Sequence, residues 1–210
     1  MHRIARWCLH WFYRALFALS RHRTSDGVTF SLFMRSVADF NIAFDKFAMA
    51  LALLREHSPR SLRAVQAHTP RVFGIGIAAM GQYLPLSDLC LVDDELLLGS
   101  ALTPSRLACT LVHEATHARL NHAGIPYRSE NKIRVERMCT RAEIQAAKTF
   151  ADWSDLQVEL ERRMASAEDL WSTSQHQAAV STKLRELGFP EWAIRLMSRD
   201  SRRGPANEEL

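Results

Sequence analysis

The hydrophobic positions of the first third of the chain predict three helices. Residues 1–20 form an amphipathic helix, because their arginines recur at helical spacing while aromatic and aliphatic side chains lie on other faces. The polar residues 21–27 are expected to break this helix. Residues 29–56 carry hydrophobic side chains mostly three or four positions apart, which predicts a long core helix. Ser61 is expected to cap a short helix that ends near His68.

The pattern changes after residue 70 and predicts a small β-region. Residues 72–78 are β-branched and interrupted by glycine, which is typical of a strand. Two apolar runs at 89–92 and 95–98 flank a pair of aspartates. They predict either one strand or a tight hairpin.

Helical spacing then returns for the rest of the chain. Thr103 followed by Pro104 places a capping residue before proline at the first helical position, so a helix is expected to run to about Asn121. Residues 131–170 are expected to be helical, with a break near residues 152–154. Beyond them the pattern predicts a further helix and a short final turn, over residues 172–187 and 192–197.

Length and composition fit one domain with appendages. A chain of 210 residues that is 47% hydrophobic and 24% charged is an ordinary globular composition and can bury a core. We expect an α+β fold that is predominantly helical. Residues 1–24 form a cationic amphipathic arm, residues 25–197 a single domain, and the polar residues 198–210 a disordered tail.

The net charge of +4 is concentrated in the arm. Residues 1–23 contain five of the 27 basic residues and no acid, which leaves 22 basic against 23 acidic residues in the remainder. A body near neutrality argues against nucleic-acid binding and favours a separate partner for the arm. Residues 1–20 are too short and too interrupted to span a bilayer. They could lie on a membrane surface, or their apolar face could pack on the protein's own body.

The four cysteines are scattered and sit in apolar surroundings. They form no CxxC pair, so free buried thiols in a reducing compartment are expected and no cysteine-based zinc site is indicated. This usage favours the cytoplasm, with the arm as a candidate for peripheral membrane attachment. The four are Cys8, Cys90, Cys109 and Cys139.

The helix expected after Thr103 contains the pattern His-Glu-x-x-His. His113 and His117 are four residues apart and therefore lie nearly above one another on a helix, where both imidazoles can reach one metal ion. Glu114 lies beside that pair, where its carboxylate can reach a water on the same metal. A catalytic zinc ion needs a third protein ligand from elsewhere in the chain.

Two acids on an otherwise apolar stripe of the next helix are candidates for this ligand. Glu136 and Glu143 share the stripe of helix 131–150 with apolar residues at a spacing of three and four. A carboxylate on a buried stripe is costly unless it is paired or bound to metal. The alternative is that each glutamate pairs with an arginine, for example one of the same helix. The candidates for that pairing are Arg134, Arg137 and Arg141.

These motifs resemble the zincin metallopeptidases over about residues 89–150. The segment 111–120, with its His-Glu-x-x-His pattern, resembles their active-site helix. The segment 135–143 resembles the glutamate helix of the gluzincin branch, because a small residue, Cys139, follows Glu136 by three positions. Minigluzincins and ImmA/IrrE-type peptidases have a similar layout. The resemblance implies a zincin-like fold, in which a small sheet packs on the first helix and the second helix carries the glutamate.

The resemblance also implies a zinc-dependent peptidase. His113, His117 and Glu136 would bind Zn²⁺, and Glu114 would act as the general base that activates a water. The segment 89–98 would be the edge strand that holds a peptide or protein substrate. The donor to the oxyanion stays open between Tyr127, His122 and Arg128.

The second shell departs from the gluzincin pattern. Thr140 stands where many members have an aspartate that orients the first histidine. Glu143, Asp93 or Asp94 could serve instead.

Two other functions fit the same sequence. The first is a non-catalytic zincin-like module that binds or regulates, and that docks a partner or a membrane through the amphipathic arm. The second is a helical interaction protein without metal. The peptidase is favoured because a purely structural site would not need Glu114 beside its histidines.

Overall fold

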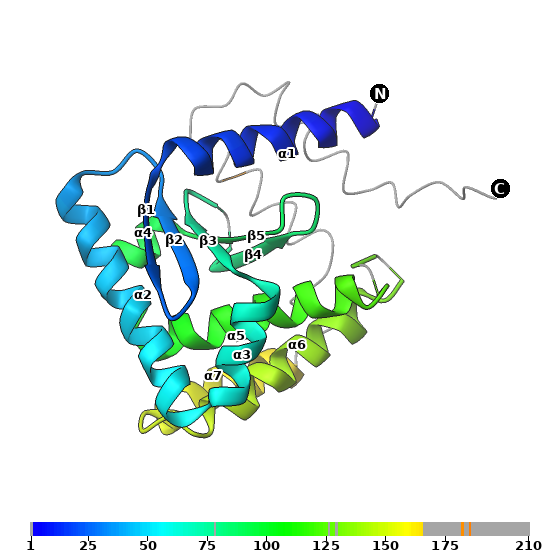
Figure 1. Cartoon of the computed structure of the whole chain (residues 1–210). Coiled ribbons are helices and arrows are strands. Elements are labelled where there is room, and N and C mark those ends of the chain that lie inside the picture. Colours follow the sequence, from blue (N-terminus) through cyan, green and yellow to red (C-terminus); the bar gives the residue numbers. More distant parts are fainter. Residues whose placement is uncertain are drawn as a thin grey trace.

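The computed structural model describes residues 2–77, 79–125, 127–128 and 130–165, together with residues 182 and 185. The expected final turn and tail lie outside the described residues, and so does nearly all of the expected helix over 172–187. The fold is α+β, with one mixed five-stranded sheet and mostly helix around it (Figure 1).

The sheet has the strand order β1-β2-β3-β5-β4. The two central pairs, β2 with β3 and β3 with β5, are parallel, whereas β1 and β4 are antiparallel edge strands. The strands are β1 (Arg21–Ser25), β2 (Val28–Leu32), β3 (Arg71–Gly74), β4 (Gly81–Leu84) and β5 (Leu89–Val92).

Helices cover both faces of this sheet. Among the described elements, α1 covers one face, and the other faces α2, α3 and α5, with α6 packed on α5 and α7 on α6 (Figure 1). The helices are α1 (His2–Leu19), α2 (Val37–His57), α3 (Pro59–His68), α4 (Asp94–Leu98), α5 (Pro104–His122), α6 (Lys132–Ala147) and α7 (Trp153–Ala165). None of the described helices is long and apolar enough to cross a membrane.

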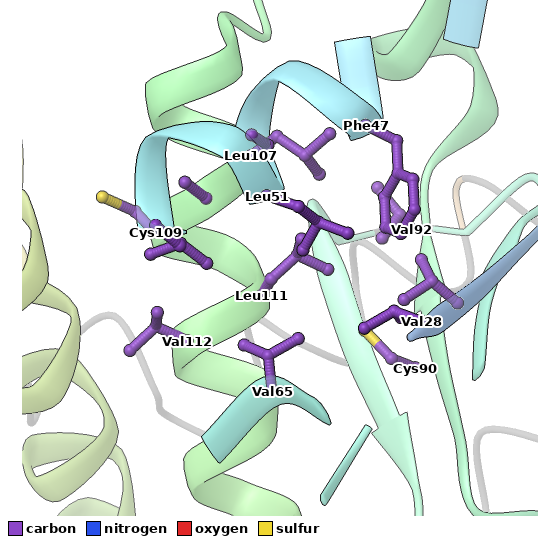
Figure 2. Close-up of a cluster of buried hydrophobic side chains, with 14 of the residues drawn as sticks. Val28, Phe47, Leu51, Val65, Cys90, Val92, Leu107, Cys109, Leu111 and Val112 are labelled. Carbon is purple, nitrogen blue, oxygen red and sulfur yellow. The ribbon is translucent and has the colours of Figure 1, made fainter. Parts of the chain in front are cut away.

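The alternation of side chains along the strands divides the core in two. In β5, Cys90 and Val92 point toward α5 and α2, where they join the main hydrophobic cluster (Figure 2). Leu89 and Leu91 point to the opposite face and, with Phe73 of β3, form a small cluster under α1. The main cluster places α5 directly against the sheet, and this position fixes the site described below.

The structure corrects the prediction for residues 21–56. Residues 21–25 form β1 instead of a polar break, and the expected helix over 29–56 is a strand, β2, followed by α2. Asp26 and Gly27 both have positive φ, +46° and +74°, which is the two-residue hairpin turn that an Asp-Gly pair favours. The side chain of Ser36 then begins α2 by accepting a hydrogen bond from the Asp39 backbone N–H.

The β-region is corrected as well. The strand expected over 72–78 ends at Gly74, and residues 95–98 belong to the short helix α4, which the Asp93 carboxylate caps at the Leu96 N–H. The edge strand β4 was not predicted. The segment 89–98 is therefore not the edge strand, because β5 lies between β3 and β4. The short helix before residue 68 is confirmed, but it begins at Pro59 after Ser58 and not at Ser61. The helix beginning after Thr103 and the break before α7 are also confirmed.

Candidate metal centre

The centre of the candidate site lies on α5, a helix that is buried on most sides. Thr103 caps its first turn through the Arg106 N–H, and Leu107 and Leu111 pack its apolar side against the sheet. His113 and Glu114 are only 6% and 5% exposed. Buried polar groups of this kind are destabilising unless other groups bond to them, so their partners define the site.

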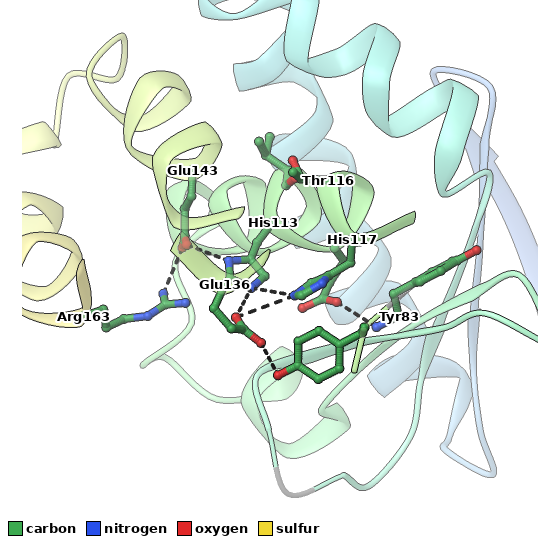
Figure 3. A network of polar contacts seen from close by, with 10 residues as sticks. Tyr83, His113, Thr116, His117, Glu136, Glu143 and Arg163 are labelled. Atoms are coloured by element: carbon green, nitrogen blue, oxygen red, sulfur yellow. Dashed lines mark hydrogen bonds and ion pairs between the residues drawn. The ribbon is translucent and has the colours of Figure 1, made fainter. Parts of the chain in front are cut away.

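Three side chains from α5 and α6 converge on one point (Figure 3). Nε2 of His113 lies 3.2 Å from Nε2 of His117. Oε2 of Glu136 lies 3.2 Å from the first of these nitrogens and 3.6 Å from the second. The expected contacts between Glu136 and histidines on the neighbouring helix are therefore present.

The spacing of these three atoms fits a tetrahedral metal site. Ligands about 2.0–2.2 Å from a tetrahedral zinc ion are separated from one another by roughly 3.3–3.6 Å. The three distances between His113, His117 and Glu136 are within about 0.1 Å of that range. One oxygen and two nitrogens are also a common donor set for zinc.

Cys139 lies at the same place, one turn after Glu136. Its sulfur and one nitrogen each of His113 and His117 all lie within 4.8 Å of one another, so this buried group could hold a metal ion. Burial, followed by the nearby Glu136 carboxylate, holds the pKa of the Cys139 thiol well above its ordinary value. Glu136 makes the closer described contacts, at 3.2 and 3.6 Å from the two histidine nitrogens, and we therefore rank it ahead of Cys139 as the third ligand.

The charge states of Glu136 and His113 depend on each other. Burial would raise the pKa of Glu136, but hydrogen bonds from His113 and His117 hold it well below its ordinary value. Burial would lower the pKa of His113, but the bonds to Glu136 and Glu143 raise it to about 10. The charge of His113 is therefore coupled to those of both carboxylates.

Glu143 is the residue that orients His113. Its Oε2 lies 3.1 Å from Nδ1 of His113, and its Oε1 accepts a 3.0 Å bond from Nη1 of Arg163 on α7. Burial would raise the pKa of Glu143, but His113 and Arg163 lower it. Glu143 is thus ionised and fixes the ring from the side opposite Glu136. Glu143 therefore does pair with an arginine, as the alternative expected, but with Arg163 of α7 and together with His113. Among the described contacts, the partners of Glu136 are His113, His117 and Tyr127.

The other candidates for that role have different partners. Asp93 caps α4 and accepts a bond from the Ile77 N–H, and Asp94 forms an ion pair with Arg35. Thr140 is fully buried, and its hydroxyl has no hydrogen-bond partner within the described part of the chain.

Glu114 faces the edge strand instead of the three converging atoms. Its Oε2 accepts a 2.7 Å hydrogen bond from the backbone N–H of Tyr83 on β4. This close approach depends on Gly81, because a Cβ there would lie 2.6 Å from Cγ2 of Thr110 and 3.1 Å from Cγ of Glu114. The unpredicted strand β4 is therefore the strand that borders the site.

Of the three oxyanion candidates, Tyr127 reaches the site. Its hydroxyl donates a 2.5 Å hydrogen bond to Oε1 of Glu136, and its ring meets that of His117 edge-on at 5.2 Å. His122 lies instead beside the Tyr83 hydroxyl, and the Arg128 guanidinium is 3.8 Å from Glu130.

Sequence reasoning missed two contributors, the Tyr83 N–H and Arg163. A backbone donor leaves no signal in residue type. Arg163 did leave one, since it continues the buried stripe of Leu156 and Leu160 at a spacing of four and three. A charged residue on such a stripe indicates a buried partner in the same way that Glu136 and Glu143 did.

Comparisons of the chain with models of known protein families, with curated proteins and with solved structures found no match. The functional argument therefore depends on the geometry of the site itself.

Proposed function

We propose that the protein is a zinc-dependent metallopeptidase of the zincin type, closest in layout to the gluzincins. One observation carries this proposal. His113, His117 and Glu136 present three donor atoms at the spacing of a tetrahedral zinc site, and a fourth group, Glu114, lies beside them without belonging to the set. A site of three ligands with an adjacent carboxylate outside the ligand set is typical of catalytic zinc.

Each buried group then has a distinct task. His113, His117 and Glu136 would hold the ion, and Glu143 keeps the His113 ring in the orientation that points Nε2 at it. When bound, zinc would polarise a substrate carbonyl and lower the pKa of a water. Glu114 would take the proton from that water and deliver it to the leaving amine.

The edge strand β4 would bind the substrate. The Tyr83 N–H points to Glu114 and not to β5, so the free edge of β4 lies on the side of the proposed base. An extended peptide paired with this edge would therefore pass close to Glu114 and to the three converging ligands. Apart from the Tyr83 N–H, which bonds to Glu114, the outward backbone groups of this edge strand suit a substrate recognised mainly by its main chain.

Tyr127 would supply the donor to the developing oxyanion by turning its O–H from Oε1 of Glu136 to the substrate oxygen. Its hydroxyl already lies within hydrogen-bond distance of the ligand Glu136, and its ring contacts the ligand His117. Burial raises the pKa of Tyr127, and the neighbouring Glu136 raises it further, so the phenol keeps its proton. A protonated phenol beside the reacting carbonyl can stabilise the negative charge on its oxygen.

The nearness of Cys139 supports a second candidate, a structural metal site in a non-catalytic module. If the Cys139 thiolate joined the two histidines and Glu136, the metal would have four protein ligands and no open position. Cys139→Ala separates the two cases. Metal content unchanged in this variant indicates the three-ligand site, whereas loss of metal indicates the closed one.

The peptidase proposal is tested with a peptide library analysed by mass spectrometry. We expect cleavage by the wild type and a loss of about 10²- to 10⁴-fold in Glu114→Gln, with zinc content unchanged. The matched control is Glu161→Gln, which makes the same chemical change on α7, where the carboxylate bonds to Gln157. If the zinc-loaded wild type and Glu114→Gln are equally inert on all peptides and on folded proteins, the peptidase proposal is wrong.

A further inference from the structure

Helix α1 has two apolar faces, and the sheet covers only one of them. Tyr13, Leu16 and Phe17 pack on the small cluster of β3 and β5, so the arm does cover the protein's own body. The Phe17 ring meets Phe73 edge-on at 5.7 Å. This packing uses the face of α1 that points toward the sheet (Figure 1).

The opposite face exposes large hydrophobic side chains. Trp11, Phe12 and Leu19 are 49%, 55% and 86% exposed. Trp11, Ala15 and Leu19 are four residues apart, and Phe12 is next to Trp11 and seven residues before Leu19. These positions therefore form one stripe on the outer side of the helix. Packing on the sheet explains the inner face but gives no reason for this outer stripe.

The segment that carries the stripe is basic in sequence. Residues 1–23 contain five arginines and no acid, although the rest of the chain has slightly more acids than bases. Arg21 and Arg23, which follow the helix, lie over aromatic rings of α2 and not beside the stripe. Arg14 lies on the same helix with its guanidinium 5.6 Å from the centre of the Trp11 ring. Exposed tryptophan, phenylalanine and leucine beside arginine are the composition of helices that lie in a membrane interface.

We propose that the outer face of α1 docks on a membrane surface that contains anionic lipid. Trp11, Phe12 and Leu19 enter the boundary between headgroups and acyl chains, and Arg14 beside them contacts the lipid headgroups. A second copy of the chain is a poorer occupant, because two such helices would bring like charges together without an acid in residues 1–23 to pair with them.

This docking leaves the candidate metal centre accessible. Helix α1 covers one face of the sheet, and α5 lies on the other (Figure 1). Membrane contact through the outer side of α1 therefore places the sheet between the bilayer and His113. The proposal is independent of the peptidase proposal and holds whether or not the site is catalytic.

The experiment measures co-sedimentation of the full chain with vesicles of phosphatidylcholine, with and without phosphatidylserine. We expect binding to the phosphatidylserine vesicles at least about tenfold stronger than to phosphatidylcholine alone, and weaker binding at high salt. The triple variant Trp11→Ser/Phe12→Ser/Leu19→Ser is expected to lose at least about tenfold of this binding while it keeps the wild-type circular dichroism spectrum and melting temperature.

The matched control removes exposed apolar area elsewhere. Ile42→Ser/Met49→Ser/Val158→Ser changes side chains that are 53%, 57% and 75% exposed on α2 and α7, and it is expected to bind like the wild type. Arg14→Glu should weaken binding to the vesicles with phosphatidylserine and leave binding to phosphatidylcholine vesicles unchanged. The proposal is overturned if the folded wild type does not bind anionic vesicles, if it binds both vesicles equally, or if the two triple variants bind alike. Self-association or a protein partner in the absence of vesicle binding would also overturn it.

Discussion

Helices α1 and α5 lie on opposite faces of the same sheet. Both depart from the usual rule that apolar side chains are buried and polar ones exposed, but in opposite ways. Helix α5 buries histidine and glutamate, whereas α1 exposes tryptophan, phenylalanine and leucine. Buried polar groups and exposed apolar patches are the observations that packing alone does not explain. The comparison therefore separates two surfaces of the molecule that we link to two different functions.

The two helices also differ in the number of other elements that contact their unusual residues. The polar groups of α5 are held by contacts from β4, α6 and α7, through Tyr83, Glu136 and Arg163 (Figure 3). The exposed residues of α1 lie on the far side from its packing surface. Substitutions around α5 should thus affect stability and function together, whereas those on the outer side of α1 should affect function alone.

The largest stability effect is expected at Glu143. Glu143→Ala removes the partner of both His113 and Arg163, and leaves the Arg163 guanidinium, whose side chain is only 24% exposed, without its carboxylate. Breaking a buried ion pair costs about 3–5 kcal/mol, and we expect about 3 kcal/mol because Arg163 keeps some solvent contact. Urea unfolding followed by circular dichroism measures this loss.

Glu159→Ala is the matched control for this prediction. Glu159 forms a 2.7 Å ion pair with Arg106, but both side chains are about one third exposed. An exposed pair contributes about 0–1 kcal/mol, so this variant should be much less destabilised. Equal losses in the two variants would show that the buried network around His113 is no more important than a surface ion pair.

The second prediction compares the two faces of α1 directly. Phe17→Ala removes a ring packed on Phe73 and should cost about 2 kcal/mol, below the full value for a core phenylalanine because Phe17 is only partly buried. Phe12→Ala, on the outer face, should change the free energy of unfolding by less than about 0.5 kcal/mol. Similar destabilisation of both variants would mean that the outer face also takes part in the fold.

The third prediction tests the close contact between β4 and α5. Gly81→Ala places a Cβ 2.6 Å from Thr110 Cγ2, so the strand or the helix must move, at a cost of about 1–2 kcal/mol. The movement should also lengthen the Tyr83 N–H bond to Glu114 and speed amide hydrogen exchange at Tyr83. Gly99→Ala is the control. Its φ of −75° is allowed for alanine, and the new Cβ would lie no closer than 3.1 Å to a neighbouring atom, the Glu95 carbonyl oxygen. Normal exchange at Tyr83 in Gly81→Ala would contradict this account.

The helical site was predictable because its signals are local or periodic. The four-residue spacing of His113 and His117 and the acid stripe of α6 need only the geometry of a helix. Glu143 was among the candidates for orienting His113, and in the structure its carboxylate lies 3.1 Å from Nδ1 of that histidine. To choose between Glu143 and Asp93, one must know which elements pack against α5. Local spacing in the sequence does not give this information.

The sheet was harder to predict because its strands are short and its edges are polar. In β1 four of five residues are exposed, so no alternation of polar and apolar residues marks it. Leu32 preceded the apolar positions of α2 closely enough to be included in one helix, although Asp26-Gly27 carried a hairpin signal. The run Leu96-Leu97-Leu98 suits a strand or a buried helix equally, and the Asp93 cap decided for the helix.

The smallest effect is expected where α5 emerges from the core. Nδ1 of His68 on α3 lies 3.4 Å from Nδ1 of His122 in the last turn of α5, near Asp88, Tyr83, Arg71 and Arg119. Burial lowers the pKa of His68, and the charges of His122 and Arg119 lower it further. The unfolded chain therefore takes up this proton first as the pH falls through about 6.5, and stability decreases from there until the pH passes the lower folded pKa.

His68→Gln should remove this part of the pH dependence. We expect the variant to lose less stability than the wild type between neutral and mildly acidic pH, because glutamine has no proton to gain in either state. Urea unfolding at a series of pH values measures the difference, and His57→Gln at the exposed end of α2 is the control. A wild type that becomes more stable as the pH falls through this window, and that loses this gain in His68→Gln, would mean that the folded state favours the charged histidine. The attraction of the Asp88 carboxylate would then outweigh burial and the neighbouring positive charges at this end of α5.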